Sequence, residues 1–395
     1  MNQYAMLAKD TNSSSIGEIW SKIISPKSRW IADGAIFSLC FGCCVFYSAF
    51  IGDIFSALSS AVGITGFLGQ RHVILCLISA AVLTPLCQLD DISALAFSSI
   101  LGVSGIFYTL FFHILRWLDR TYAKGGRFFV QLAQKSRPTV ASYTLWKVNK
   151  ETLVLMNMLC VAYLAQYNAI NYYKELENTS PQRYTYAISI GFAISILTFA
   201  TMMFVGYNLF GATAQPLILN NFHRTNDILA TFARFATGLA ITFAYPLMFA
   251  GLKTSLRNLL PAPTLAIKTG PTTTTIVVAT KTSDLWFKRG AIPLVLALIT
   301  GIAVKCSEED VSVVLGLVGS VLGCSVAYIL PAFLKLKQVY AVAAVKDSQS
   351  GKSGSRSVVG IKDVWSQYAL IALGLVCGGL GVWVTAVEAS AGGHH

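Results

Sequence analysis

The chain has 395 residues, of which 54% are hydrophobic and only 12% are charged, and its formal net charge is +12. Its mean hydropathy is +0.61. Apolar segments this long and this numerous exclude a soluble globular domain, because one soluble core cannot cover them, and predict an integral membrane protein. The positive charge suits anionic lipid headgroups. No basic domain stands apart from the apolar segments, so no nucleic-acid partner is expected.

Nine apolar segments are candidates for crossing the bilayer, which takes about 20 helical residues. Each is expected to be an α-helix, because a helix satisfies its own backbone groups in hydrocarbon. The segments are residues 31–51, 73–89, 92–115, 153–173, 184–207, 228–249, 290–304, 311–334 and 368–387. Residues 290–304 are the shortest, and are either re-entrant or a span extended by the aromatic residues Trp286 and Phe287. We expect this segment to span, which predicts an all-α membrane protein with about nine transmembrane helices.

The polar segments around these helices are short, which predicts a single membrane domain over residues 31–387. An N-terminal segment, residues 1–30, precedes it, and a tail, residues 388–395, follows. The main connections are a basic loop at 116–150, a loop at 253–289 and a flexible loop at 346–362. Placing residues 1–30 in the cytoplasm puts more Lys and Arg on the inner side, as the positive-inside rule favours, although the basic loop then lies outside.

The titratable residues form no pattern typical of an enzyme or a metal centre. Cys40, Cys43 and Cys44 share one apolar helix with no neighbouring His or carboxylate, so we interpret them as small packing residues. The histidines inside the membrane domain lie far apart on different helix ends, without paired carboxylates. The chain is therefore not expected to be an enzyme.

Prolines inside apolar segments mark places where helical hydrogen bonding is interrupted. Pro246 has no N–H, so the carbonyl of Thr242, four residues earlier, loses its helical donor. Thr242 then offers a carbonyl oxygen and a hydroxyl, the oxygen ligands that hard cations prefer. The alternative is a kink whose freed carbonyl is satisfied by neighbouring hydroxyl groups, and the same two interpretations apply at Pro85 and Pro331.

Two further features concern how the helices pack. Glycines recur on the faces of three helices, where close packing of small residues supplies much of the association in lipid. They are Gly102, Gly105, Gly316, Gly319, Gly323, Gly374 and Gly378. Arg234 is a cation inside an apolar helix, and pairing with Asp227 or snorkelling to the outer headgroups would both accommodate it.

Several short motifs follow one another along the chain. They are residues 41–53 ending in Gly52-Asp53, Thr84-Pro85-Leu86, Leu95–Ser99, residues 166–176, Gly206–Gly211, Arg234 with Thr242 and Pro246, and residues 310–319 leading to 329–333. This order and spacing resemble the amino acid/auxin permease family, most closely its sodium-coupled neutral amino acid transporter branch. Gln166 stands where that branch commonly has His.

The resemblance implies a LeuT-type inverted-repeat helical bundle. Aligned with the family, the chain begins near the end of the second helix, at Ala5–Lys9, so we expect an N-terminally truncated permease that lacks the first two helices. The implied activity is secondary active transport of small neutral amino acids by alternating access. No cofactor is expected beyond a coupling cation. We favour Na⁺ over protons, because Asp33, Asp53 and Glu175 lie near helix ends rather than at mid-membrane.

The resemblance also implies the site residues. The helix at 153–173 is expected to break near Ala162 to Gln166, and the break would bind the amino acid. Ala162 and Ala165 would leave room, Tyr163 would form an aromatic wall, and Gln166 would offer its amide, while Thr242 would hold the coupling cation. Ordinary core packing is the alternative for Tyr163.

Two other functions remain open at this point. A permease-derived receptor or assembly subunit that does not transport would explain the missing helices, and so would an inactive truncated gene product. The expected location is the plasma membrane or a vacuolar or lysosomal membrane, and the oligomeric state is left open.

Overall fold

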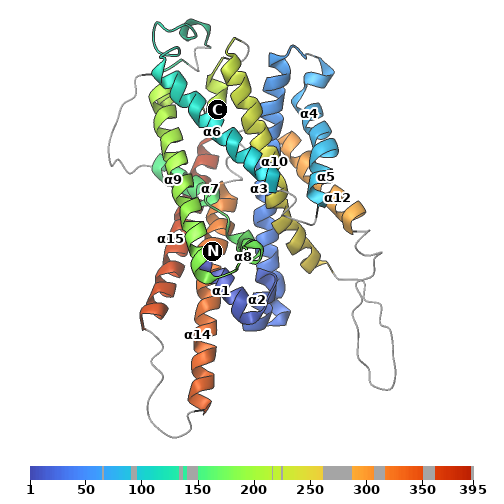
Figure 1. Cartoon of the computed structure of the whole chain (residues 1–395), viewed down its shortest axis with the longest axis vertical. Helices are drawn as coiled ribbons and strands as arrows, with labels where there is room; N and C mark the ends of the chain where they lie inside the picture. The colour runs from blue at the N-terminus through green and yellow to red at the C-terminus, as the bar shows by residue number, and fades with distance from the viewer. Residues whose placement is uncertain are drawn as a thin grey trace.

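The computed structural model describes residues 1–64, 66–89, 96–132, 137–139, 150–215, 217–223, 226–260, 287–306, 316–349 and 361–392. In this part of the chain every regular element is helical, and most of the long helices run side by side in one bundle (Figure 1). Eight of the described helices are long and apolar enough to cross a membrane. These findings confirm the predicted all-helical membrane protein.

The helices fall into long spans and short connecting elements. The α-helices are α1 (Asn2–Thr11), α2 (Ile16–Ile23), α3 (Arg29–Ala61), α4 (Arg71–Ile78), α5 (Thr84–Gln88), α6 (Ala96–Leu118), α7 (Lys150–Ala162), α8 (Ala169–Glu175), α9 (Pro181–Phe210), α10 (Ile228–Leu259), α12 (Ile292–Lys305), α14 (Leu330–Gln349) and α15 (Ile361–Gly392). The 3₁₀-helices are η1 (Pro26–Ser28), η2 (Phe67–Gly69), η5 (Phe129–Gln131), η7 (Gln166–Asn168), η8 (Gly211–Thr213) and η9 (Ile218–Asn221). The π-helical segments are η3 (Ser79–Leu83), η10 (Phe287–Ala291), η11 (Gly319–Gly323) and η12 (Ser325–Ile329).

The eight spans correspond to eight of the nine predicted segments. The short segment at 290–304 is extended by η10, so that Phe287–Lys305 reaches 19 residues and is long enough to cross; Trp286 lies outside the described residues. The ninth segment, 153–173, is divided between α7 and α8. The inverted-repeat arrangement and the sidedness of the bundle stay predictions.

Several predicted connections are shorter than expected, because helices run into them. The helix α6 continues to Leu118, α10 to Leu259 and α14 to Gln349, into the loops expected from 116, 253 and 346. The N-terminal segment likewise forms α1 and α2, whose apolar faces join the main core. Residues 140–149, 261–286 and 350–360 lie outside the described part of the chain.

The centre of the bundle is an antiparallel pair formed by α3 and α10, which stand side by side in Figure 1. A Cβ atom placed on Gly251 would lie 3.0 Å from Cys40 Sγ, and one on Gly238 would lie 3.0 Å from Ile54. Later residues of α3 thus contact earlier residues of α10, which shows that the two helices run antiparallel. Cys40, Cys43 and Cys44 are buried in this core, in line with the packing role expected for them.

Small residues bring the neighbouring helices close, as their spacing predicts. A Cβ atom on Gly105 of α6 would lie 2.6 Å from the carbonyl oxygen of Ala236 on α10. On α15, a Cβ atom on Gly374 would lie 2.7 Å from Ile329, and one on Gly378 would lie 3.0 Å from the carbonyl oxygen of Ser320. These close approaches are compatible with glycine and confirm its packing role.

Three prolines share one local structure. Pro85, Pro293 and Pro331 each follow the end of a π-helical segment, η3, η10 or η12, by two residues. A proline ring crowds the carbonyl four residues earlier, and a widened turn makes room for it. At the first of them, the Thr84 hydroxyl donates to the carbonyl oxygen of Ser79 at 2.8 Å, two residues before Ala81, whose carbonyl loses its helical donor at Pro85. Pro246, by contrast, lies in continuous α-helix.

Arg234 does not pair with Asp227. Its guanidinium is 1% exposed and donates to the carbonyl oxygens of Leu219 and Phe222, both at 2.8 Å. Asp227, which is fully buried, instead accepts two hydrogen bonds from the guanidinium of Arg116, one of them at 2.9 Å. Both alternatives stated for Arg234, pairing with Asp227 and snorkelling to headgroups, are therefore wrong.

Candidate functional site

The predicted span at 153–173 is broken in its middle. The helix α7 ends at Ala162, residues 163–165 are not helical, and the 3₁₀-turn η7 then leads into α8. The last hydrogen bond before the break is donated by the Leu164 N–H to the carbonyl oxygen of Val161 at 3.0 Å. A broken helix leaves backbone donors and acceptors without helical partners, which is how transporters build sites inside a membrane. The break lies where the family resemblance implied it.

Three side-chain hydrogen bonds hold the chain after the break in place. The Nδ2 of Asn168 donates to the carbonyl oxygen of Leu247 on α10 at 2.9 Å, and its Oδ1 accepts from Asn171 Nδ2 at 3.2 Å. The Tyr184 hydroxyl of α9 donates to the carbonyl oxygen of Ala169 at 2.7 Å. Asn168 and Ala169 are fully buried. The broken helix is therefore anchored to α10, one residue after Pro246.

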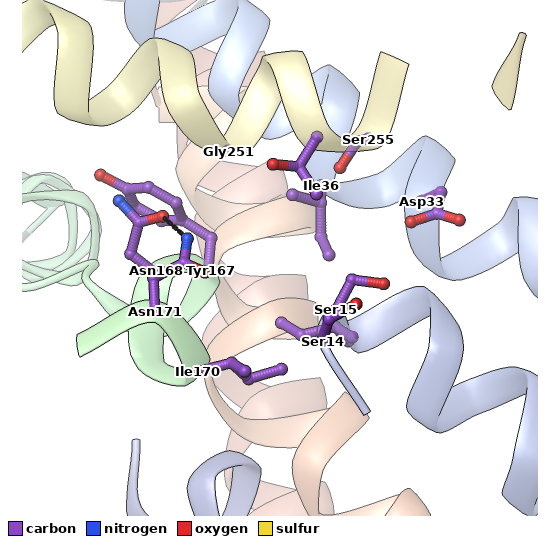
Figure 2. A pocket seen from close by; sticks show the side chains of 12 residues that line it. Ser14, Ser15, Asp33, Ile36, Tyr167, Asn168, Ile170, Asn171, Gly251 and Ser255 are labelled. Carbon is purple, nitrogen blue, oxygen red and sulfur yellow. Dashed lines mark hydrogen bonds between the residues drawn. The ribbon is translucent and has the colours of Figure 1, made fainter. Parts of the chain in front are cut away.

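A polar pocket opens beside this anchor. It is small, with a cavity volume of about 20 Å³. It is lined by Ser14, Ser15, Ile16, Asp33, Ile36, Tyr167, Asn168, Ile170, Asn171, Gly251, Thr254 and Ser255. Figure 2 shows α10 along one side, the serines of the α1–α2 connection opposite it, the asparagines of the broken helix at one end and Asp33 of α3 at the other. Four separate parts of the chain thus meet around this space.

The charge inside the pocket is balanced. Asp33 is 1% exposed, and its Oδ2 accepts from Arg29 Nε at 3.0 Å while its Oδ1 accepts from Asn258 Nδ2 at 3.0 Å. A Cβ atom on Gly17 would lie 2.3 Å from the same carboxylate, so α2 closes over it. The other polar lining groups are hydroxyls and amides. The pocket therefore presents hydrogen-bonding groups without an uncompensated charge.

The four residues predicted to bind substrate surround the break but do not line this pocket. Ala162 is exposed, and Ala165 and Gln166 are half-buried, with Gln166 Oε1 accepting from the Ala165 N–H at 2.8 Å. The ring of Tyr163 lies against Phe199 of α9, with centroids 5.4 Å apart. Tyr163 thus makes the packing contacts given as its alternative, and the substrate role of all four residues stays a prediction.

Thr242 lies nearer the start of α10, on the face that meets α3. It precedes Leu247 by five positions, which corresponds to about 7.5 Å along the helix axis. Thr242 is 4% exposed, and its hydroxyl donates to the carbonyl oxygen of Gly238 at 2.7 Å. The hydroxyl proton is therefore occupied by the helix itself. The hydroxyl oxygen keeps its lone pairs for a cation, so the proposed ligand role stays a prediction.

Sequence reasoning missed Tyr167, Asn168 and Asn171, which line the pocket directly after the break. A signal for them was available. Two asparagines three residues apart on an apolar helix, next to an expected break, need buried hydrogen-bond partners. Asp33 was considered only as a residue near a helix end. Its burial under α2 depends on Gly17, which is distant from the break in sequence.

A family model matches most of the chain. The model described as transmembrane amino acid transporter protein covers residues 1–346. That family consists of transporters and not of enzymes, in agreement with the expectation from the sequence. It also agrees with the resemblance stated from the motifs and with the described helices long enough to cross a membrane.

Individual relatives are more distant. The chain is similar to vacuolar amino acid transporter 7 of Saccharomyces cerevisiae, with 27% identity over 236 residues, which are 58% of this chain and 44% of that protein. It is similar to amino acid transporter AVT6E of Arabidopsis thaliana, with 24% identity over 263 residues, 63% of this chain and 51% of that protein. Vacuolar amino acid transporter 6 of Saccharomyces cerevisiae is 20% identical over 349 residues, 81% of this chain and 75% of that protein.

The chain spans about half the length of the first two of these relatives. The spans and the relatives together identify an integral membrane protein, and the expected vacuolar or plasma membrane location agrees with the names of the two yeast relatives, which are called vacuolar.

Proposed function

Because the chain belongs to the family of transmembrane amino acid transporter proteins, we propose that it carries small neutral amino acids across a membrane. The observation that carries this proposal is the broken helix between α7 and α8, with a polar pocket directly beside it. An amino acid needs hydrogen-bond donors for its carboxylate and acceptors for its ammonium group. The backbone groups released at a helix break supply both.

The substrate is proposed to lie at the break itself. The small side chains of Ala162 and Ala165 leave room beside the backbone, and Gln166 offers its amide. Tyr163 would form the wall that separates the site from α9, where its ring already lies. The pocket beyond Tyr167 would then be the passage between the site and one membrane surface.

The preference for a neutral side chain follows from the charge balance of that passage. Asp33 already accepts from Arg29 and Asn258, so a cationic side chain finds no free carboxylate there. An anionic side chain would come close to the Asp33 carboxylate, which carries the same charge. A neutral side chain needs only hydroxyl and amide partners, which the pocket offers.

Cation coupling and alternating access complete the proposal. Thr242 would bind the cation, preferably Na⁺, through its hydroxyl oxygen and the carbonyl oxygen that Pro246 leaves without a helical donor. Asn168 connects the broken helix to α10 close to this turn, so movement of the break would also move the cation site. The bundle would rock around α3 and α10, opening the break alternately to the two sides.

Uptake into proteoliposomes tests the proposal. The reconstituted chain is expected to take up radiolabelled alanine or glutamine, faster with an inward Na⁺ gradient than with choline. Thr242→Ala should lose the Na⁺ dependence, whereas Thr242→Ser, which keeps the hydroxyl, should retain it. Equal Na⁺ dependence in the two variants would remove Thr242 from the cation site. Absence of both uptake and substrate binding in a folded preparation would contradict the transport proposal.

A further inference from the structure

A large apolar cavity lies between three of the spans, and none of its lining residues belongs to the broken helix. Its volume is about 370 Å³. One wall is α3 and a second is α12. The third is formed by Val318, which immediately precedes η11, and by Leu322 within η11. Both α12 and η11 pack against α3. The proposed transport mechanism does not use this cavity.

The lining of the cavity is almost entirely hydrocarbon. Among its side chains only the Ser38 hydroxyl and the Cys306 thiol are polar. A buried water molecule needs several polar partners, so the lining suits an apolar occupant. An apolar cavity of about 150 Å³ is already large enough to bind benzene. This cavity is larger, and therefore has room for a longer hydrocarbon.

The open side of the cavity faces the bilayer. All three walls belong to segments that are long and apolar enough to cross a membrane. Leu298, which lines the cavity, is 54% exposed. The exposed side chains close to it in the chain or across the cavity are also apolar, with Leu294 70% and Val321 48% exposed. Apolar side chains exposed within a span are surrounded by lipid acyl chains, which are therefore the molecules that can enter here.

A basic residue lies at one end of the cavity. Lys305 follows Ile302 by three residues and Leu298 by seven, a spacing that places it on the same face of α12 as these two lining residues. Lys305 is exposed and is the last residue of its span, so its ammonium group can reach the lipid headgroups. An apolar cavity with a cation at its end fits an amphiphile that has a negatively charged head.

We propose that this cavity binds one acyl chain of a membrane phospholipid, whose phosphate pairs with Lys305. The acyl chain comes from hydrocarbon, so no transfer from water drives its binding. Its affinity comes from the van der Waals contacts made when the cavity is filled, and from the attraction between the phosphate and the ammonium group. The lipid site does not depend on the proposed transport.

Photolabelling of the full chain tests the site. The protein is reconstituted in phosphatidylcholine vesicles with a trace of phosphatidylcholine that carries a diazirine in the middle of one acyl chain. After irradiation, mass spectrometry locates the label. Val45 lines the cavity and is only 4% exposed, so its labelling reports lipid inside the cavity. Leu197 of α9 is 70% exposed and reports the surrounding lipid. Both should be labelled, and label on Leu197 without label on Val45 overturns the proposal.

Two variants that fill the cavity sharpen this test. Ile302→Trp fills it from α12 and should abolish labelling of Val45 but not of Leu197. The matched control is Leu294→Trp, on the same helix but outside the lining, and both labels should remain. Ser38→Phe adds a ring at an exposed lining position, without entering the packed interior, and should also reduce the label on Val45. Full labelling of Val45 in folded Ile302→Trp and Ser38→Phe would show that the label does not enter through the cavity.

The headgroup is tested in detergent, where the phospholipid probe can be titrated. Lys305→Gln should raise the probe concentration that labels half of the Val45 sites, and an unchanged concentration would remove Lys305 from the site. A diazirine sterol, which has no phosphate, should label Val45 less than the phospholipid does. Stronger labelling by the sterol overturns the choice of a phospholipid. Labelling of Val45 in a preparation without amino acid uptake supports the lipid site and counts only against transport.

Discussion

Gly251 of α10 and Tyr167 of the broken helix are in a contact that has no room for a larger residue. A Cβ atom on Gly251 would lie 2.7 Å from Tyr167 Cδ2 and 3.0 Å from Cys40 Sγ. Tyr167 therefore reaches into the interface between α10 and α3 because residue 251 has no side chain. The same tyrosine lines the pocket, so helix packing and the shape of the passage depend on one glycine.

Gly251→Ala is expected to displace Tyr167 and to lower the free energy of unfolding by about 1–3 kcal/mol, the usual cost of overpacking. The thermal unfolding temperature in detergent and substrate affinity should both fall. Gly301→Ala on α12 is the matched control, since a Cβ atom there meets nothing within 4 Å. The double variant Gly251→Ala with Tyr167→Ala should recover part of the loss. Equal melting temperatures for the two alanine variants would contradict the contact.

Asn168→Ala is expected to release the broken helix from α10. The variant loses the hydrogen bond to the Leu247 carbonyl oxygen and leaves Asn171 without its acceptor, at a cost of about 1–3 kcal/mol. Substrate affinity, measured by scintillation proximity with labelled alanine, should fall with stability. Asn171→Ala removes only the second of these bonds and should have a smaller effect. A larger effect for Asn171→Ala would show that the link to α10 is not the anchor.

Arg116→Met is expected to destabilise the fold strongly, by about 3–5 kcal/mol, because it leaves the buried carboxylate of Asp227 without its cation. The remaining donors are the Tyr122 hydroxyl at 2.8 Å and the Ala230 N–H at 3.2 Å. Burial, followed by the negative charge of Asp227, raises the pKa of Tyr122, so this hydroxyl stays protonated and keeps donating.

The double variant Arg116→Met with Asp227→Asn tests that account. It removes the buried charge and keeps an asparagine, which is a good residue at the start of a helix such as α10. Stability measured by thermal unfolding should be largely restored relative to Arg116→Met alone. If the double variant is as unstable as the single one, packing around the guanidinium, and not the unpaired carboxylate, causes the loss.

Acidification is expected to loosen the start of α2 beside the pocket. Ser15 Oγ accepts from the Glu18 N–H at 3.2 Å, and Glu18 Oε2 accepts from the Ser14 N–H at 2.7 Å, one residue before the N-cap, so that the arrangement resembles a capping box. Burial alone raises the pKa of Glu18, but the hydrogen bonds from Ser14 and the charges of Arg29 and Lys22 outweigh it and lower the pKa. The ionised Glu18 carboxylate therefore stabilises the start of α2 fully above the ordinary carboxyl pKa. This stabilisation is lost as the pH falls through the lowered pKa of Glu18.

Hydrogen exchange at the Ser14 amide measures this loss. Protection should decrease as the pH is lowered below the usual range of a glutamate, after correction for the intrinsic exchange rate. In Glu18→Gln the amide side chain still accepts the bond, so protection should be weaker but independent of pH in that range. A pH dependence that persists in Glu18→Gln would assign the effect to another group.

The positions of most spans followed from hydropathy, because helices are the simplest way to satisfy backbone groups in lipid. The break after Ala162 followed from the motif around Gln166 and Tyr172, not from periodicity, which continues through it. The sequence showed Pro85 and Pro331 only as interruptions of helical hydrogen bonding. In the structure, a π-helical turn before each of them makes room for the proline ring.

Side-chain partners were harder to predict. Asp227 precedes Arg234 by less than two helical turns, so a local ion pair seemed reasonable. In the structure, Arg116 from another helix donates to the Asp227 carboxylate, and Arg234 donates to backbone carbonyl oxygens. The pocket was missed for the same reason. Ser15, Asp33, Asn171 and Ser255 are brought together by four segments distant in sequence.

Composition and hydropathy alone determined that this protein is a helical membrane protein and where eight of its described apolar helices lie, since burial in lipid depends on the apolar length of each segment. The motifs alone also indicated its family. Only the tertiary structure decided which polar groups meet, because a buried carboxylate or amide takes its partner from whichever helix packs against it. The pairing of Asn168 with Leu247 and of Asp227 with Arg116 comes from packing between helices, which no local pattern encodes.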